Sequence, residues 1–394
     1  MKKKIFIISV GYVCTPTPSD KKFVLDIVQD LASEFDITVW SLNDMNSCKN
    51  GKTAYCGKNN SYKFYNRNRI FHNSLGLKYK PHPLHSNIRN GLEINLSLLW
   101  YLVTHLRAKI NECNPDIIHL SDSIGPITSL IKILYKDIPV TITKPTVRIS
   151  VNPVYNLWVR LSLKKTDCIF TFTRCSLRQL EKIGIQKEKI NVLPWGVPVS
   201  PNNLSINKEI LIRKRYNCSK DELLIVLIPR VAVSDLYAYI NHIKKISATV
   251  RAKFVFAIRP TRYVDSFSKI GNDKVFIESG PDDFYDLLSA ADVSIAHTDE
   301  QKNIISSSLL PLTWMESMLR ETPVFTNKAP GIEDLIIDNH TGVAYKTDDD
   351  LISGLLANNI NNMKINARKL ILDKFTLSKI SSMYSNIWKN ILTR

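Results

Sequence analysis

The residues best suited to chemistry gather in the last third of the chain. Three serines, Ser306 to Ser308, come shortly before Pro311 and a segment of helical period that carries Glu316 in its first turns. The free backbone N–H groups and the dipole of a helix N-terminus favour an anion such as a phosphate. A carboxylate one turn further along can accept hydrogen bonds from vicinal hydroxyl groups. The pattern is typical of a site for a phosphorylated ligand that carries hydroxyl groups, although the serines could also serve only as helix caps.

Arginines follow two further segments that we expect to be buried strands. Arg230 comes after the apolar run 223–228, and Arg259 and Arg262 come after the run 254–258. Ligands of open α/β sheets bind at the carboxyl ends of the strands, where a guanidinium group can hold a diphosphate through two parallel hydrogen bonds. Each of these arginines could instead be an ordinary solvated surface residue.

The first half of the chain offers a possible base and several cations. His119 and Asp122 lie at the end of an expected strand, and either type of side chain can take a proton from an attacking hydroxyl group. Asp122 could equally cap the helix expected from Ile124. Lys144 and Arg148 follow another expected strand and could contact a sugar or a phosphate.

The rest of the chain alternates between short apolar runs and segments of helical period. Such alternation is typical of a parallel sheet with helices on both faces. Both halves show it, so we predict an α/β fold with two doubly wound, Rossmann-like domains. The pattern G-x-G-x-x-G does not occur, so a dinucleotide cofactor is not indicated. Strands are expected at 5–10, 37–40, 117–120, 140–143, 168–172, 223–228, 254–258, 275–277, 293–296 and 324–326, and helices at 22–33, 96–110, 124–134, 236–250, 282–290 and 312–320.

A linker between the domains is expected at 193–201, where prolines and Gly196 are concentrated. We therefore predict domains at 1–197 and 198–375, followed by a helix at 376–394 that packs on the second domain or returns to the first. Residues 46–91 are rich in Asn, Lys and Tyr and have weak periodicity, so they are interpreted as a long insertion.

Charge is distributed unevenly along the chain. Residues 1–200 carry 28 Lys and Arg against 14 Asp and Glu, a net charge of +14, whereas residues 201–394 carry 25 against 22, a net charge of +3. The first domain is therefore expected to meet an anionic partner, such as a lipid diphosphate or an anionic membrane surface. Nucleic acid is not expected, because the sequence contains no helix-turn-helix, zinc-finger or aromatic RNA-binding motif.

Cysteine usage and hydropathy indicate the compartment. The seven cysteines are scattered without a C-x-x-C pair, so neither a disulfide framework nor a metal site is expected. The apolar run 94–106 is too short to cross a bilayer, and the apolar run after Lys4 is interpreted as a first strand, not as a signal peptide. We expect a cytoplasmic protein without metal or cofactor. Peripheral binding to the inner face of the plasma membrane stays open, because aromatic and basic residues mix at 96–110 and 154–165.

Several short motifs, taken in their order and spacing, resemble those of GT-B-fold glycosyltransferases, most closely the glycogen-synthase-like group of nucleotide-sugar transferases. They are N-P-D-I-I-H at 114–119, K-T-D-C-I-F at 165–170, K-I-N-V-L-P-W-G-V at 189–197, I-P-R at 228–230, D-F-Y-D-L-L-S-A-A-D-V at 283–293, and the stretch 309–345. The resemblance covers nearly the whole chain. It implies two Rossmann-like domains that face a cleft, with the acceptor bound mainly by the first and the nucleotide-sugar by the second. The implied function is transfer of a sugar to a lipid-linked or polysaccharide acceptor hydroxyl group in bacterial surface glycan synthesis.

The resemblance also implies roles for single residues. Arg230 would stabilise the departing diphosphate, Glu316 would bind the ribose hydroxyl groups, and Asp122 would be the base of an inverting enzyme. The candidate donor-binding residues are Gly11, Arg230, Arg259, Arg262, Gly280, Ser307, Ser308, Leu309, Leu310 and Glu316; the acceptor or cleft candidates are His119, Lys144 and Arg148; no metal ligand is expected.

Three positions depart from the pattern of this family. Ser308 stands where the family usually has the first Glu of a pair, Asp235 where it has a Lys, and Lys144 where it often has a His. The donor, the acceptor and the choice between retention and inversion therefore stay open. Two alternatives from other classes also remain, namely a non-catalytic GT-B-like subunit that binds glycan or lipid, and a nucleotide-sugar epimerase.

Overall fold

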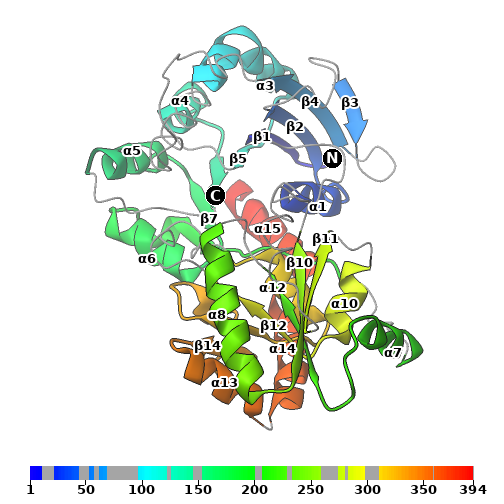
Figure 1. The fold of residues 1–394 in the computed structure, drawn as a ribbon. Helices are drawn as coiled ribbons and strands as arrows, with labels where there is room; N and C mark the ends of the chain where they lie inside the picture. The colour runs from blue at the N-terminus through cyan, green and yellow to red at the C-terminus, as the bar shows by residue number, and fades with distance from the viewer. Residues whose placement is uncertain are drawn as a thin grey trace. The chain divides into compact units, whose positions relative to one another are not determined.

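The computed structural model describes most of the chain, and the chain forms two compact units (Figure 1). Unit 1 comprises Met1–Gly196 and Leu377–Arg394, and unit 2 comprises Val197–Thr376. The last helix of the chain therefore belongs to unit 1. The described residues are 1–10, 22–43, 53–56, 62–68, 96–121, 126–144, 153–199, 206–228, 233–258, 274–279, 283–297, 310–357 and 359–393.

Unit 1 is built around an eight-stranded sheet with the order β3-β4-β2-β1-β5-β6-β7-β8. Neighbouring strands are parallel except at the edge, where β3 and β4 are antiparallel. The central strands β5, β6 and β7 are short and buried throughout, as expected for parallel strands covered on both faces. The strands are β1 (Lys4–Val10), β2 (Asp36–Asn43), β3 (Thr53–Cys56), β4 (Tyr62–Asn68), β5 (Ile117–Ser121), β6 (Val140–Thr143), β7 (Cys168–Thr171) and β8 (Ile190–Val192).

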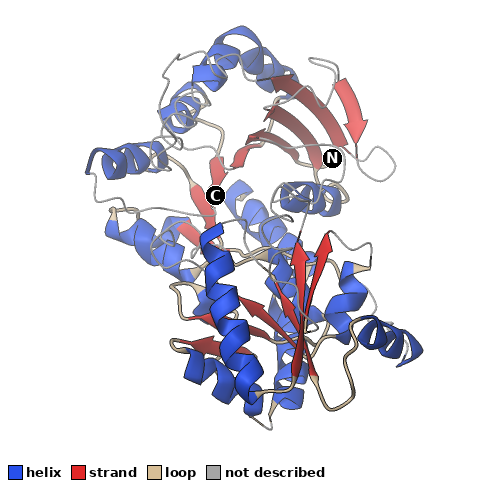
Figure 2. Cartoon of the chain, in the orientation of Figure 1, coloured by secondary structure: helices blue, strands red, loops and turns tan. Residues whose placement is uncertain are grey.

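Helices cover both faces of this sheet (Figure 2). Alternate residues of β1 point to opposite faces, so Phe6 and Ile8 join a core with Leu106, whereas Ile7 lies on the side of Trp388 from the C-terminal helix. The helices of unit 1 are α1 (Lys22–Leu31), a π-helical turn η2 (Leu102–Leu106), α3 (Arg107–Cys113), α4 (Pro126–Leu134), α5 (Pro153–Leu163), α6 (Arg174–Lys182), the 3-10 turn η3 (Lys187–Lys189) and α15 (Leu377–Leu392).

Unit 2 is built around a six-stranded parallel sheet with the order β11-β10-β9-β12-β13-β14. The chain runs outward from β9 to β11, returns to the other side of β9 with β12, and runs outward again to β14. The strand order therefore reverses between β9 and β12. The strands are β9 (Leu223–Leu227), β10 (Ala252–Ile258), β11 (Val275–Ser279), β12 (Val293–Ala296), β13 (Val324–Asn327) and β14 (Gly342–Tyr345).

Two separate cores form on the two faces of this sheet. Ile225 and Leu227 of β9 pack with α8 and α13, whereas Leu224 and Val226 pack with α7 and α10. The helices of unit 2 are α7 (Ile206–Arg215), α8 (Val233–Thr249), α10 (Phe284–Ala290), α12 (Leu312–Leu319), the 3-10 turn η5 (Ile332–Asp334), α13 (Asp348–Leu356) and α14 (Ile360–Lys374).

An aspartate directly before the strand anchors β5, β7 and β12 at their amino ends. Asp116 accepts a hydrogen bond from the backbone N–H of Lys4 at 2.7 Å, and Asp167 accepts one from that of Val140 at 2.7 Å. Asp292 accepts one from the N–H of Leu224 at 2.9 Å. In each case the donor is the first or second residue of the neighbouring strand, so the carboxylate ties two strands together at the edge opposite their carboxyl ends.

The predicted α/β class with two doubly wound parallel sheets is confirmed. Two local features differ from the sequence prediction. The helix expected at 96–110 contains a π-helical turn at Leu102–Leu106, and the segment interpreted as an insertion contributes the edge strand β3 and its neighbour β4. β4 pairs with β2, so this part of the insertion extends the sheet.

Candidate functional site

The carboxyl edge of the unit 2 sheet is the place where an open α/β fold binds ligands. In such sheets the ligand crevice lies at the point where the strand order reverses, which here is the boundary between β9 and β12. Helices that follow a strand begin at this same edge. α10 follows β11 and α12 follows β12, so the first turns of both helices lie beside the carboxyl ends.

Glu316 of α12 is buried at this edge with half of its hydrogen-bonding capacity unused. Its side chain is only 6% exposed. One carboxylate oxygen, Oε1, accepts a hydrogen bond from the hydroxyl group of Tyr285 in α10 at 2.8 Å. The other oxygen, Oε2, is buried and has no hydrogen-bond partner among the described residues. A buried acceptor without a donor is costly, which makes this oxygen ready to accept from a ligand hydroxyl group.

Arg320 completes the group one turn further along α12. Its guanidinium carbon lies 4.3 Å from the centre of the Tyr285 ring, a cation–π arrangement. Burial lowers the pKa of Arg320, while the nearby Tyr285, Glu316 and Asp286 act in the opposite direction. Arginine stays charged under these conditions, so the site holds a cation beside a carboxylate and an aromatic ring. We call Tyr285, Glu316 and Arg320 the α12 cluster.

Sequence reasoning identified Glu316 but missed the two residues that surround it. Tyr285 lies in the motif at 283–293, and Arg320 lies four residues after Glu316, which is the spacing that places two side chains on the same helix face. That spacing was the available signal. Leu310 is 1% exposed, directly before the Pro311 that caps α12, so its side chain anchors the helix start.

In unit 1, His119 is buried and lines a cavity together with Thr143 and Tyr384. It is 5% exposed, its Nδ1 lies 2.8 Å from the hydroxyl oxygen of Thr141, and its Nε2 lies 3.1 Å from that of Thr143. Thr143 in turn lies 3.0 Å from the hydroxyl oxygen of Tyr384 in α15. Burial lowers the pKa of His119 to about 3, so the imidazole is neutral at physiological pH. Both ring nitrogens are engaged, so this histidine holds β5, β6 and α15 together, and its role as an acceptor-binding residue stays a prediction.

Lys144 is also buried, at 5% exposure, directly after β6. Its backbone N–H donates to the carbonyl oxygen of Phe170 at 2.7 Å, which continues the pairing of β6 with β7. The other predicted site residues lie outside the described residues, and their roles stay predictions. They are Gly11, Asp122, Arg148, Arg230, Arg259, Arg262, Gly280, Ser307, Ser308 and Leu309.

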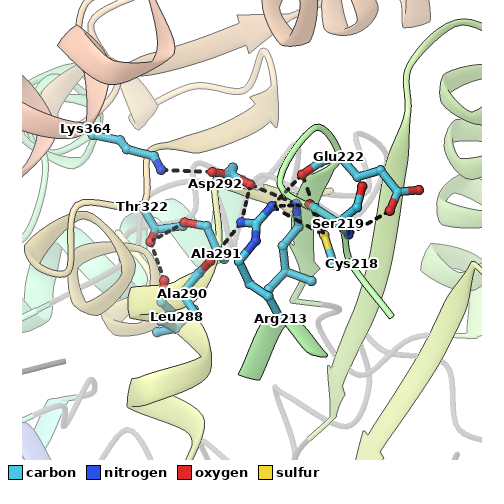
Figure 3. Close-up of polar contacts among 11 residues, drawn as sticks. Arg213, Cys218, Ser219, Glu222, Leu288, Ala290, Ala291, Asp292, Thr322 and Lys364 are labelled. Atoms are coloured by element: carbon cyan, nitrogen blue, oxygen red, sulfur yellow. Dashed lines mark hydrogen bonds and ion pairs between the residues drawn. The ribbon is translucent and has the colours of Figure 1, made fainter. Parts of the chain in front are cut away.

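Asp292, the last acidic residue of the motif at 283–293, has a structural role (Figure 3). Its carboxylate forms ion pairs with Arg213 of α7 at 2.9 Å and with Lys364 of α14 at 3.0 Å, besides its hydrogen bond to Leu224. Burial raises the pKa of Asp292, but the three donors together lower it by more than burial raises it. The pKa of Asp292 therefore lies below its ordinary value. The network lies at the amino edge of the sheet, away from the α12 cluster.

Two kinds of feature are absent from the described residues, a cluster of metal ligands and a membrane-spanning helix. Within those ranges, no group of three or more His, Cys, Asp or Glu side chains is arranged to hold a metal ion. No described helix is both long and apolar enough to cross a membrane.

Comparison with known proteins agrees with the fold. Residues 22–200 match the model of Glycosyltransferase Family 4. The structure resembles sucrose-phosphate synthase from Thermosynechococcus elongatus (13% identity, TM-score 0.70, 100% of both chains covered) and a glycosyltransferase from Rickettsia africae (15% identity, TM-score 0.68, 99% of both chains covered). It also resembles Anabaena HepE in complex with UDP and glucose (12% identity, TM-score 0.61, 98% of this chain and 99% of that chain covered). No curated protein sequence matches the chain.

The family match and the fold therefore lead to the same conclusion. The match covers much of unit 1, whereas the structural likeness extends over both units. The motifs that suggested this relationship in the sequence lie in both units as well. The chain has the GT-B fold of these glycosyltransferases, and its residues 22–200 match Glycosyltransferase Family 4.

Proposed function

We propose that this glycosyltransferase takes a sugar from a nucleotide-sugar donor bound at the carboxyl edge of the unit 2 sheet and transfers it to a hydroxyl group of a lipid-linked or polysaccharide acceptor in bacterial surface glycan synthesis. The observation that carries the proposal is Glu316, which is buried with one oxygen bonded to Tyr285 and the other without a donor among the residues that the structure describes. A ribose presents two neighbouring hydroxyl groups, either of which can donate to this free oxygen.

The same edge suits the other parts of a nucleotide diphosphate. A helix that begins there presents backbone N–H groups that favour an anion. Arg230 follows β9 in the sequence and would hold the diphosphate as the bond to the sugar breaks. A complex of HepE, which shares this fold, contains UDP and glucose, and this supports a nucleotide donor for the present chain.

Of the two acceptor classes, the residues of unit 1 favour the lipid-linked one, with an anionic group. Residues 1–200 have a net charge of +14. Along the helical segment 96–106, the apolar side chains Leu99, Trp100 and Val103 are 42%, 53% and 78% exposed. Exposed apolar side chains beside basic ones favour an anionic membrane surface. A peripheral position on the inner face of the plasma membrane would bring the enzyme to a lipid-linked acceptor.

The role of Glu316 can be tested with nucleoside diphosphates and their 2′-deoxy forms. Binding of UDP, GDP, CDP and ADP is measured by calorimetry, and the tightest is compared with its 2′-deoxy analogue. Replacement Glu316→Gln should weaken binding about 10- to 100-fold, the range for a lost hydrogen bond to a charged group. The variant should also discriminate less between the ribose and deoxyribose forms, because the discriminating acceptor is lost.

Glu321→Gln is the matched control. Glu321 lies one turn away with its side chain 47% exposed, in an ion pair to Arg368 at 3.6 Å, so its replacement should leave binding unchanged. Equal affinity of wild type and Glu316→Gln would refute the ribose role. Absence of binding for every diphosphate would favour the non-catalytic subunit, whereas conversion of the donor without an acceptor would favour the epimerase.

A further inference from the structure

The strand order of unit 2 reverses between β9 and β12, and the hydrogen-bond ladder between these two strands ends near their carboxyl ends. Its last rung runs from the N–H of Ile228 to the carbonyl oxygen of Ile295 at 3.2 Å. In a parallel pair, alternate residues of a strand face the same neighbour and the rungs are evenly spaced. The next residue of the β12 side that faces β9 is therefore His297, and its N–H would be expected to donate to the carbonyl oxygen of Ile228.

The hydroxyl group of Tyr239 forms hydrogen bonds with both the carbonyl oxygen of Ile228 and the N–H of His297 instead. It donates to the carbonyl oxygen of Ile228 at 3.2 Å and accepts from the N–H of His297 at 2.7 Å. Tyr239 lies on α8, the helix that follows β9, and its side chain is completely buried. One phenol oxygen thus occupies the position of a rung, and it separates the two strands where a direct hydrogen bond would draw them together.

A second side chain of α8 holds the ring of His297. His242 lies one turn after Tyr239, and its Nε2 is 3.4 Å from Nδ1 of His297. The other nitrogen of His242, Nδ1, lies 2.5 Å from the carboxylate of Asp348. Asp348 also pairs with Lys245 at 2.5 Å. Side chains of α8 therefore contact both the backbone and the ring of His297. Asp348 of α13 orients the imidazole ring of His242, which lies between Asp348 and His297.

We propose that Tyr239 is a positioning residue that keeps the β9–β12 ladder open at its carboxyl end, so that the diphosphate of a nucleotide-sugar can enter between the two strand ends. This inference rests on the proposed function. The ligand class is supported independently of Tyr239 by the free buried oxygen of Glu316, on the helix that follows β12. Without the phenol oxygen, Ile228 and His297 can form the missing rung directly and close the entrance.

Replacement Tyr239→Phe removes only the phenol oxygen and keeps the ring that packs in the core. We expect the affinity for the tightest-binding of UDP, GDP, CDP and ADP to fall about tenfold or more, while the melting temperature stays close to that of the wild type, since the two freed backbone groups can satisfy each other. A crystal structure of the variant should show a direct hydrogen bond from the N–H of His297 to the carbonyl oxygen of Ile228.

Thr341→Val is the matched control in the same unit. The buried hydroxyl group of Thr341 also bridges two backbone groups, since it accepts from the N–H of Ile337 at 2.9 Å and donates to the carbonyl oxygen of Leu335 at 3.0 Å. It lies before β14, at the amino edge of the sheet. Its loss should lower the melting temperature and leave nucleotide affinity unchanged, because no ligand entrance depends on it.

The outcomes separate this inference from the proposed function. Wild-type affinity in Tyr239→Phe, or a crystal structure of the wild type with the direct Ile228–His297 bond, would overturn the positioning role. An equal loss of affinity in Thr341→Val would also overturn it, because the effect would then follow from general destabilisation. If the wild type bound no nucleoside diphosphate, the proposed donor site would be refuted. The presence or absence of the direct His297–Ile228 hydrogen bond in the Tyr239→Phe structure would still decide whether Tyr239 keeps the ladder open.

Discussion

Asp292 offers the clearest test of how unit 2 is held together, because a single carboxylate joins three elements there. The replacement Asp292→Asn keeps the shape and one oxygen for the N–H of Leu224, but removes the negative charge that faces Arg213 and Lys364. The two cations are then left partly buried beside a neutral group. We therefore expect a loss of stability confined to unit 2, with little change in the fold.

The size of the loss follows from burial. Removing one partner of a fully buried ion pair costs about 3–5 kcal/mol. The side chain of Asp292 is 19% exposed and those of Arg213 and Lys364 are 15% and 24% exposed, so water compensates for part of the lost interaction. We expect a loss of about 2–3 kcal/mol, which lowers the melting temperature of a unit of this size by roughly 5–10 °C.

The dependence on pH gives a second, independent readout. The pKa of Asp292 lies below the ordinary value of 3.8 in the folded protein. Its contribution to stability is therefore complete above about pH 4 and is lost as the pH falls through the folded pKa. The difference in melting temperature between wild type and Asp292→Asn should be constant near neutral pH and should shrink below pH 4.

Scanning calorimetry at several pH values measures both effects. The control is Asp283→Asn, which breaks a more exposed ion pair to Arg215 at 2.8 Å and should cost less than about 1 kcal/mol. A melting temperature of Asp292→Asn within about 2 °C of the wild type at pH 7, corresponding to less than about 1 kcal/mol, would refute the reasoning that this carboxylate joins β12 to α7 and α14.

Three further predictions follow from other residues. His119 has its pKa lowered to about 3 by burial, so its contribution to stability is complete above about pH 6.5 and is lost as the pH falls toward 3. In urea denaturation, the contribution of His119 to the free energy of unfolding should be about 2 kcal/mol smaller at pH 5 than at pH 7. His119→Gln should remove this part of the pH dependence. A methyl group at Gly342 would lie 2.2 Å from the carbonyl oxygen of Val324, so Gly342→Ala should destabilise unit 2 by about 3 kcal/mol in thermal melts; a neutral effect would contradict the β13–β14 register. Trp100→Ser should reduce cosedimentation with vesicles rich in anionic lipid, whereas Ile206→Ser, at an exposed apolar residue of unit 2, should not; equal binding of both variants would argue against the proposed membrane surface.

Strand positions could be predicted where buried runs are bounded by polar residues. Val140–Thr143 and Val293–Ala296 were predicted with the bounds that the structure has, because both are short apolar runs buried on both faces. β3 and β4 could not be found in this way. They are the outermost and the second strand on one side of the sheet, and their sequences T-A-Y-C and Y-K-F-Y-N-R-N carry no continuous apolar signal.

The site could be predicted only in part, because it depends on contacts between distant segments. Glu316 was identified from its motif, but nothing in the sequence indicates that Tyr285 reaches it from another helix. His119 is the opposite case. Its position near the end of β5 is typical of a ligand-binding residue, yet its neighbours Thr141 and Thr143 on β6 satisfy both ring nitrogens. Such pairing between strands is set by register, which a local motif does not contain.

The aspartates at 116, 167 and 292 have a consequence for how this protein can evolve. Each secures the order of two strands from the end where no ligand is expected. The segments beyond the opposite ends are therefore free to accept new residues without disturbing the arrangement of the sheets. Lys144 follows β6 on that side of the sheet. A chain built in this way can change the residues at the ligand-facing edge of its sheets while it keeps the same scaffold.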